Sequence, residues 1–188
     1  MKKVVVGMSG GVDSSVTAYL LKEEGYGVEG VSFILYEARM KTTFTGCCSI
    51  EAINNARQTA EHMGVKHSTV DLRDEFMENV IEPFIAAYSK GITPNPCILC
   101  NKHIKFPYLL KIANEKGADF IATGHYARVI SAEAQKCGSA EDTRHKASEI
   151  PSFRASILKK GIDTKKDQSY VLYVLSEEKL NRLKLPLG

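Results

Sequence analysis

The sequence predicts an α/β fold, a doubly wound, Rossmann-like parallel sheet with helices on both faces. Short apolar runs at residues 4–6, 28–35, 67–72 and 120–123 have the length and composition of buried strands. Segments with helical periodicity separate these runs, so strands and helices alternate along the chain. In such sheets ligands bind beyond the carboxyl ends of the strands, which is where the site is expected.

The first half of the chain is expected to hold two helices between three strands. After the first strand, Val16, Tyr19 and Leu20 recur at helical spacing. Ser49 is a residue type that caps helices and Gly64 is one that ends them. A second helix is therefore predicted between these two positions.

Prolines shape the middle of the chain. Residues 74–88 predict a third helix, which Pro83 should kink because proline lacks an N–H. The Pro-Asn-Pro stretch at 94–96 predicts a stiff, extended segment. A fourth helix is expected to begin within residues 100–105 and to run to about residue 116.

The last third of the chain is less regular. Residues 131–155 are rich in Ser, Ala, Glu and Lys, and we expect them to form a surface excursion. A short strand at 156–158, a polar basic turn at 161–170 and a short helix at 177–183 follow. No closing element is visible after them. We expect one domain over residues 1–188.

Composition limits the classes of protein. The 188 residues carry a net charge of +3, but residues 144–166 hold seven Lys or Arg and two acidic residues, as a phosphate-backbone contact requires. No apolar run approaches the length that spans a membrane, and no signal-peptide pattern is present, so the expected location is the cytoplasm. The five cysteines, an odd number, argue against a disulfide framework.

The Ser-Gly-Gly-Val-Asp-Ser-Ser turn after the first strand is the clearest chemical signal. Gly10 and Gly11 allow the backbone to approach a ligand closely. The N–H groups of the following helix start, with the hydroxyls of Ser9, Ser14 and Ser15, predict an anion cradle whose expected guest is a phosphate.

Other interpretations of this turn are less favoured. It lacks the Gly-Lys-Ser/Thr of the common P-loop and the Gly-x-Gly-x-x-Gly of dinucleotide folds. An ordinary turn before a Ser-rich helix start remains an alternative. The turn resembles the pyrophosphate loop of the ATP-pyrophosphatase superfamily, whose members split ATP between the α and β phosphates.

The Cys97-Ile98-Leu99-Cys100 stretch is the second signal. This spacing serves redox dithiols, zinc sites and iron–sulfur ligation, and two buried thiols are the alternative without chemistry. A thiolate is favoured at a helix N-terminus and beside Lys102, His103 and Lys105. Because the helix is expected to begin near Cys100, that thiol is predicted to be the better nucleophile.

Five segments, in order along the chain, resemble the N-terminal ATP-pyrophosphatase (PP-loop) domain of the tRNA-specific 2-thiouridylase family, MnmA or TrmU. The family's fold is of the adenine nucleotide alpha hydrolase type. The matching segments are residues 7–15, 93–102, 104–106, 122–128 and 166–170.

The resemblance implies a role for each matching position. Cys100 would be the catalytic nucleophile, with Cys97 and Asp13 as further catalytic residues. ATP would be bound by Gly7, Met8, Ser9, Gly10, Gly11, Val12, Asp13, Ser14, Phe33 and Gly124. tRNA would be contacted by Asn95, Pro96, Cys97, His125, Lys166, Asp167 and Gln168.

The reaction that the resemblance implies is thiolation of uridine 34 in the tRNA anticodon stem-loop. ATP, with Mg²⁺ on its phosphates, would adenylate the uridine, and a persulfide sulfur would then displace AMP from C2. The sulfur would come from a partner sulfurtransferase or sulfur carrier. The family's central and C-terminal tRNA-binding domains are absent from these 188 residues.

Several alternatives stay open. Many family members have Asp where this chain has Cys97. The Cys97–Cys100 pair could therefore hold a disulfide, carry the persulfide or ligate an iron–sulfur cluster. Other classes are a different adenylating synthetase with the same loop, an iron–sulfur-dependent tRNA thiolase, or a non-catalytic metal-binding module.

Overall fold

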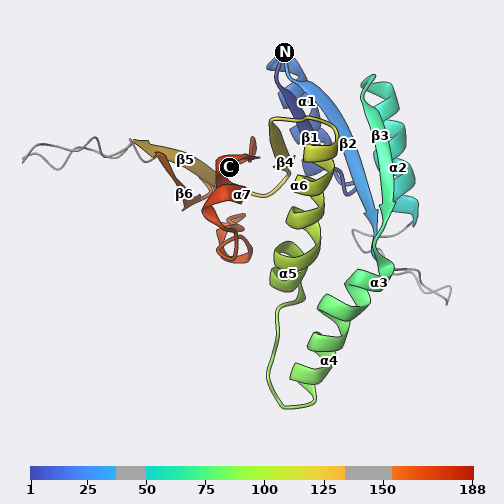
Figure 1. Cartoon of the computed structure of the whole chain (residues 1–188), viewed down its shortest axis with the longest axis vertical. Helices are drawn as coiled ribbons and strands as arrows, with labels where there is room; N and C mark the ends of the chain where they lie inside the picture. The colour runs from blue at the N-terminus through green and yellow to red at the C-terminus, as the bar shows by residue number, and fades with distance from the viewer. Residues whose placement is uncertain (37–49, 134–153) are drawn as a thin grey trace, which may run out of the picture.

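The computed structural model describes residues 1–36, 50–133 and 154–188 (Figure 1). Its centre is a five-stranded sheet with the strand order β3-β2-β1-β4-β7, in which every neighbouring pair is parallel. The strands are β1 (Lys3–Gly7), β2 (Gly27–Ile34), β3 (Lys66–Asp71), β4 (Phe120–Thr123) and β7 (Leu183–Lys184). The predicted doubly wound α/β class is therefore confirmed, together with its first four strands.

Helices cover both faces of the sheet because the side chains of β1 alternate between them. Val4 and Val6 pack with Ala18 of α1 (Val12–Glu23) and Ala56 of α2 (Ile50–His62). Val5 packs on the other face with Phe106, Leu109 and Ala113 of α6 (Phe106–Glu115). This period of two is the alternation that a pleated strand imposes.

A helical arm projects from the sheet between β3 and α6 (Figure 1). It consists of α3 (Arg73–Phe76), the π-helical turn η1 (Met77–Ile81), α4 (Glu82–Tyr88), α5 (Pro96–Leu99) and the π-helical turn η2 (Cys100–Lys105). Each π turn precedes a helix with proline in its first turn, Pro83 and Pro107, where an intrahelical hydrogen bond is missing. The predicted disturbance at Pro83 is confirmed.

The fourth helical segment begins earlier than predicted, and this prediction was wrong. Asn95 is the N-cap, its side-chain Oδ1 accepts a hydrogen bond from the Cys97 N–H at 3.0 Å, and Pro96 opens α5. Cys100 therefore lies one turn inside the helical run, and Cys97 lies in its first turn.

In the C-terminal third, the predicted short strand at 156–158 lies within β6 (Arg154–Lys160), whereas β5 (Ala127–Glu133) and β7 were not predicted. β5 pairs antiparallel with β6 in a separate two-stranded sheet. The predicted excursion at 131–155 is therefore too long at both ends, and residues 134–153 lie outside the described part. η3 (Ser169–Val171), α7 (Glu177–Asn181) and β7 follow, so β7 is a closing element where none was expected.

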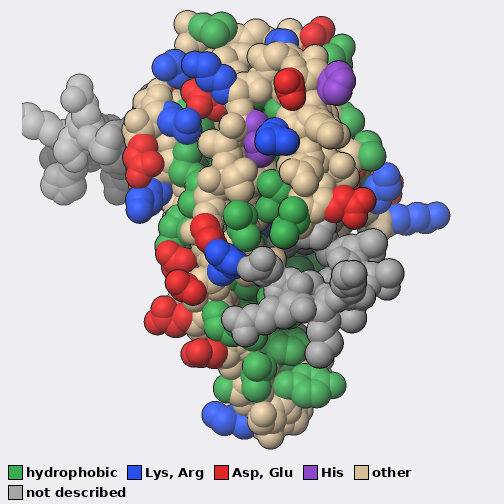
Figure 2. All heavy atoms as spheres, turned by 90° about the vertical axis from the view of Figure 1, so that its right-hand side faces the viewer, with side chains coloured by type: hydrophobic (Ala, Val, Ile, Leu, Met, Phe, Trp, Pro, Cys, Tyr) green, Lys and Arg blue, Asp and Glu red, His purple; other side chains and the backbone are tan. Residues whose placement is uncertain are grey.

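Exposed apolar side chains gather at the tip of the arm. Ile85, Tyr88 and Ile92 are each more than half exposed, and Figure 2 shows hydrophobic side chains at this end of the molecule. Within the described residues, no helix combines the length and apolar character that crossing a membrane requires.

Candidate active site at the start of α1

The Ser-Gly-Gly turn connects the carboxyl end of β1 to the first turn of α1. Gly10 has φ +78°, and a Cβ added there would overlap the backbone carbonyl of Ala52 in α2. Only glycine combines this backbone conformation with this close approach. The turn therefore lies directly against the start of α2.

Hydroxyl groups fix the shape of this turn. The Ser14 hydroxyl donates to the Gly11 carbonyl at 3.0 Å and accepts from the Ser9 N–H at 3.2 Å, and the Ser15 hydroxyl also donates to Gly11. Ser14 is buried, whereas Ser9 is exposed. The N-cap Gly11 has no side chain to accept from the first-turn N–H groups of α1, so these donors are available to a ligand.

The loop after β4 packs on the same helix start. A Cβ added to Gly124 would lie 2.8 Å from the Asp13 carbonyl carbon and 2.9 Å from the Ser14 nitrogen. The loop after β4 therefore lies against the first turn of α1, directly after the turn that contains Ser9.

Tyr126 connects this helix start to the basic turn at 161–170. Its hydroxyl donates to Asp13 Oδ1 at 2.7 Å. Its backbone N–H donates to Gln168 Oε1 at 3.1 Å, and the Gln168 N–H donates to the Tyr126 carbonyl at 2.8 Å. Lys166 Nζ lies 5.1 Å from the centre of the Tyr126 ring. A cavity of about 350 Å³ opens here, lined by Asp13, Tyr126, Lys165, Lys166, Asp167, Gln168 and Tyr170.

Asp167 shapes the basic turn from within. One of its carboxylate oxygens accepts from the Gly161 N–H at 2.8 Å, and the other accepts from the Ser169 hydroxyl at 2.8 Å. The bond from Gly161, followed by those from Ser169, lowers the pKa of Asp167 against a smaller opposing effect of burial. Its carboxylate is therefore held as an acceptor that keeps the turn closed.

His125 lies at the junction of β4 and α6. Its Nδ1 is 2.8 Å from the Thr123 hydroxyl, and its ring lies 6.0 Å from that of Phe106. Burial, and to a smaller extent the charge of Lys105, lowers the pKa of His125 to about 3. The ring is therefore neutral at physiological pH, and it can hydrogen-bond or stack on a base but brings no positive charge.

The two cysteines differ in access. Cys97 is exposed in the first turn of α5, whereas Cys100 is buried at the start of η2. Because Cys97 and not Cys100 stands at the helix N-terminus, the dipole argument for Cys100 as the better nucleophile was wrong, and that role now depends on the resemblance alone. The two residues are not joined in a disulfide.

Two further residues bear on the site. Phe33, near the end of β2, is half-buried and packs against core clusters on either side of it. Asn101 is buried, and its side-chain amide donates to the Val171 carbonyl at 2.9 Å, while its Oδ1 has no hydrogen-bond partner. Asn101 thereby joins the cysteine-bearing helix to the segment after the basic turn. In the sequence, Asn101 is marked only by its place beside Cys100 in the matching segment 93–102.

Metal ligands are few in this region. In the described ranges, no three His, Cys, Asp or Glu side chains come together as a metal site. Cys47, Cys48 and Cys137 lie outside those ranges, so the prediction of a cluster at Cys97 and Cys100 stays untested.

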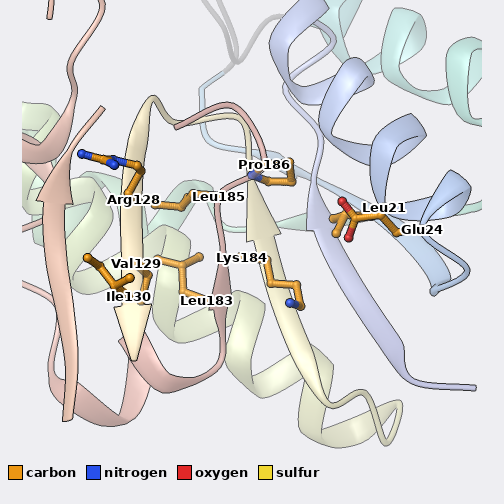
Figure 3. Close-up of a pocket in the computed structure, with 9 residues that line it drawn as sticks. All are labelled: Leu21, Glu24, Arg128, Val129, Ile130, Leu183, Lys184, Leu185 and Pro186. Carbon is orange, nitrogen blue, oxygen red and sulfur yellow. The ribbon is translucent and has the colours of Figure 1, made fainter. Parts of the chain in front are cut away.

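A second hollow, of about 320 Å³, lies between β5, β7 and the last turns of α1 (Figure 3). Leu21 of α1 and its C-cap residue Glu24 line it, together with Arg128 from β5 and Lys184 from β7. Because it adjoins the end of α1 opposite to Asp13, it is separate from the candidate site.

Comparison with known proteins assigns the chain to a family. The tRNA methyl transferase HUP domain matches residues 2–188. Curated relatives named tRNA-specific 2-thiouridylase MnmA share 46% identity in Caldanaerobacter subterraneus (MnmA 1) and 45% in Carboxydothermus hydrogenoformans, over 99% and 100% of this chain. The chain spans about half the length of these relatives, 47% in each case.

Among solved structures, one of a predicted subunit of tRNA methyltransferase from Methanocaldococcus jannaschii is similar. The alignment covers 100% of this chain and 68% of that chain. The identity is 18% and the TM-score 0.45, which supports no conclusion about function.

Proposed function

Since the chain belongs to the tRNA methyl transferase HUP domain family, we propose that it is the catalytic PP-loop domain of an ATP-dependent tRNA-uridine 2-sulfurtransferase. Its product would be 2-thiouridine at position 34 of tRNA. The observation that carries the proposal is one cavity shared by the start of α1, which can hold phosphates, and a turn with two exposed lysines. An enzyme that adenylates RNA has to bind ATP and RNA next to each other.

ATP would bind at the turn between β1 and α1. The first-turn N–H groups of α1 would donate to its phosphates, with Gly10 and Gly124 allowing the close approach. Phe33 would lie near the adenine. Mg²⁺ fits this site as a companion of the phosphates: Asp13 is exposed and uses only Oδ1 for Tyr126, so its second oxygen can face the ion. When bound, Mg²⁺ would neutralise phosphate charge.

tRNA would approach from the side of the basic turn. Lys159, Lys160, Lys165 and Lys166 are all exposed and would meet backbone phosphates. Asn95, Pro96 and Cys97 would face the target base, which must leave the anticodon stack to reach a buried thiol. His125, being neutral, would contact a base, whereas Asp167 would act by holding the turn and Gln168.

The chemistry divides into three displacements. The uridine O2 attacks the α-phosphate of ATP and pyrophosphate leaves, which converts a poor leaving group into AMP. The outer sulfur of a cysteine persulfide then attacks C2 and AMP leaves, so that the tRNA is joined to that cysteine through an S–S bond. A second thiol attacks the cysteine sulfur of this bond, which releases 2-thiouridine and leaves a disulfide. Cys100, in the role that the resemblance gives it, would act as the thiol nucleophile, and a partner sulfurtransferase or sulfur carrier would supply the sulfur. Iron and mass analysis of anaerobically purified protein would distinguish a persulfide on Cys97, a Cys97–Cys100 disulfide and a cluster ligated by the two thiols.

The domain organisation is part of the same proposal. Residues 1–188 would form one catalytic domain, and the tRNA-holding domains would correspond to the half of the relatives that this chain does not match. The reaction would take place in the cytoplasm, where tRNA is modified.

The test is release of AMP from ATP with and without unmodified tRNA. AMP and pyrophosphate that appear only with tRNA would support the adenylating function. AMP release driven equally by a small carboxylate or amine would favour another adenylating synthetase. In the Cys100→Ser variant, ATP binding should persist while 2-thiouridine formation, measured by nucleoside mass spectrometry, is lost; undiminished thiolation would contradict the assignment.

A further inference from the structure

Tyr126 joins the two parts of the site through different groups. Its side-chain hydroxyl bonds to Asp13 at the start of α1, whereas its backbone N–H and carbonyl form the reciprocal pair with Gln168 in the basic turn. A shift of the turn would therefore be carried to Tyr126 by two hydrogen bonds, and from Tyr126 to the Asp13 carboxylate by a third.

We propose that Tyr126 is a positioning residue that couples RNA binding at Lys165 and Lys166 to ATP binding at the start of α1. The inference rests on the proposed function, because it takes ATP and tRNA as the two ligands. Each ligand would strengthen the binding of the other, and reciprocity requires the same factor in both directions.

The coupling follows from what each ligand has to order. Lys165 and Lys166 are exposed, and Lys166 lies over the Tyr126 ring, so an RNA phosphate that binds these lysines also fixes the turn. The fixed turn holds Gln168, Gln168 holds the backbone of Tyr126, and the hydroxyl holds Asp13. ATP, with Mg²⁺ on its phosphates, then meets an Asp13 carboxylate that is already in place to face the ion, so the second ligand pays less of the ordering entropy.

The hydroxyl remains a donor under ordinary conditions. The hydrogen bond to Asp13 is the main cause that raises the pKa of Tyr126, and the nearby Lys166 lowers it to a smaller extent. The phenol is therefore protonated at neutral pH and the link to Asp13 is kept.

The Tyr126→Phe variant separates the two sites with little other change. It removes the bond to Asp13 but keeps the ring under Lys166 and both backbone bonds to Gln168. The measurement is the Kd of ATP for the 188-residue chain, by equilibrium dialysis, with and without saturating anticodon stem-loop RNA. We expect RNA to tighten ATP binding about tenfold in the parent chain and less than about twofold in Tyr126→Phe.

The matched control is Tyr173→Phe, which removes the hydroxyl of an exposed tyrosine outside the cavity. It should keep the full coupling, and both variants should melt at the temperature of the parent chain. Coupling that is equal in Tyr126→Phe and the parent, or absent from the parent, would overturn the inference. The inference would also be overturned if Tyr126→Phe weakened ATP binding by the same factor with and without RNA. The hydroxyl would then contribute to ATP binding alone and not to the coupling. A parent chain that binds neither ATP nor RNA would instead refute the proposed function itself.

Discussion

Gly10 provides the sharpest test of how the phosphate-binding turn is built. In Gly10→Ala, the residue would have to keep φ +78°, at a cost of about 1–2 kcal/mol for a residue with a Cβ. Its Cβ would also overlap the Ala52 carbonyl, and relieving this overlap by moving backbone costs about 1–3 kcal/mol more. The expected loss is about 2–5 kcal/mol of unfolding free energy, which lowers the melting temperature by about 4–20 °C in a chain of this size.

Gly11→Ala is the matched control, one residue away in the same turn. Gly11 has φ −86°, and its added Cβ would lie 3.6 Å from the Ser9 hydroxyl, an ordinary contact. The loss of glycine at an N-cap costs within about 1 kcal/mol, so melting should fall by no more than about 4 °C. Thermal unfolding followed by circular dichroism compares the two variants with the parent. Melting temperatures that agree within a degree would refute the argument that Gly10 is required by its contact with α2.

Three further predictions concern charge and access. Cys97 should react with iodoacetamide at least about tenfold faster than the buried Cys100, as peptide mass spectrometry would show; equal rates would contradict the assigned burial. Lys165→Ala and Lys166→Ala should each reduce the salt dependence of RNA binding by about one unit of log K against log salt, while Lys90→Ala, an exposed change on the arm, should not. The pKa of His125 in the folded state lies below its value near 6.5 in the unfolded state, so the unfolded state gains the proton first as the pH decreases. The free energy of unfolding therefore falls between about pH 6.5 and pH 3, by at most about 1.4 kcal/mol per pH unit. Urea unfolding at pH 7 and pH 5 measures this difference in unfolding free energy, which should disappear in His125→Asn. An unchanged difference would show that another group causes it.

β1 was the strand most clearly visible in the sequence, because it is buried on both faces. Val4, Val5 and Val6 are fully buried, so β1 is apolar throughout and visible as a continuous run. β7 is two residues long, and its strand conformation depends on pairing with Ile121 and Ala122 in β4, which no local pattern reveals. The β5–β6 pair likewise depends on register between residues far apart, and Ile130 and Ile157 leave its surface partly exposed.

The helix start at Pro96 was missed for a reason of local chemistry. Two prolines in three residues predict extended chain, yet Asn followed by Pro is also the N-cap and first position of a helix. The hydrogen bond that the Cys97 N–H donates to Asn95 Oδ1 favours the helix start over the extended chain. The error moved the helix N-terminus from Cys97 to Cys100 and with it the argument about which thiol is activated.

Close backbone approach, rather than side-chain pairing, assembles most of the candidate site. Gly10 lies against α2, Gly124 lies against Asp13, and a Cβ on Gly161 would come within 3.0 Å of the Tyr126 carbonyl. The first two positions bring α2 and the end of β4 onto the start of α1, and the third brings the basic turn onto Tyr126. Side chains around the cavity, such as Tyr126 with its hydroxyl, add single hydrogen bonds between segments that backbone contacts already hold together. Substitutions of side chains should therefore separate binding, coupling and chemistry from one another, whereas alanine at these glycines should disturb all three together.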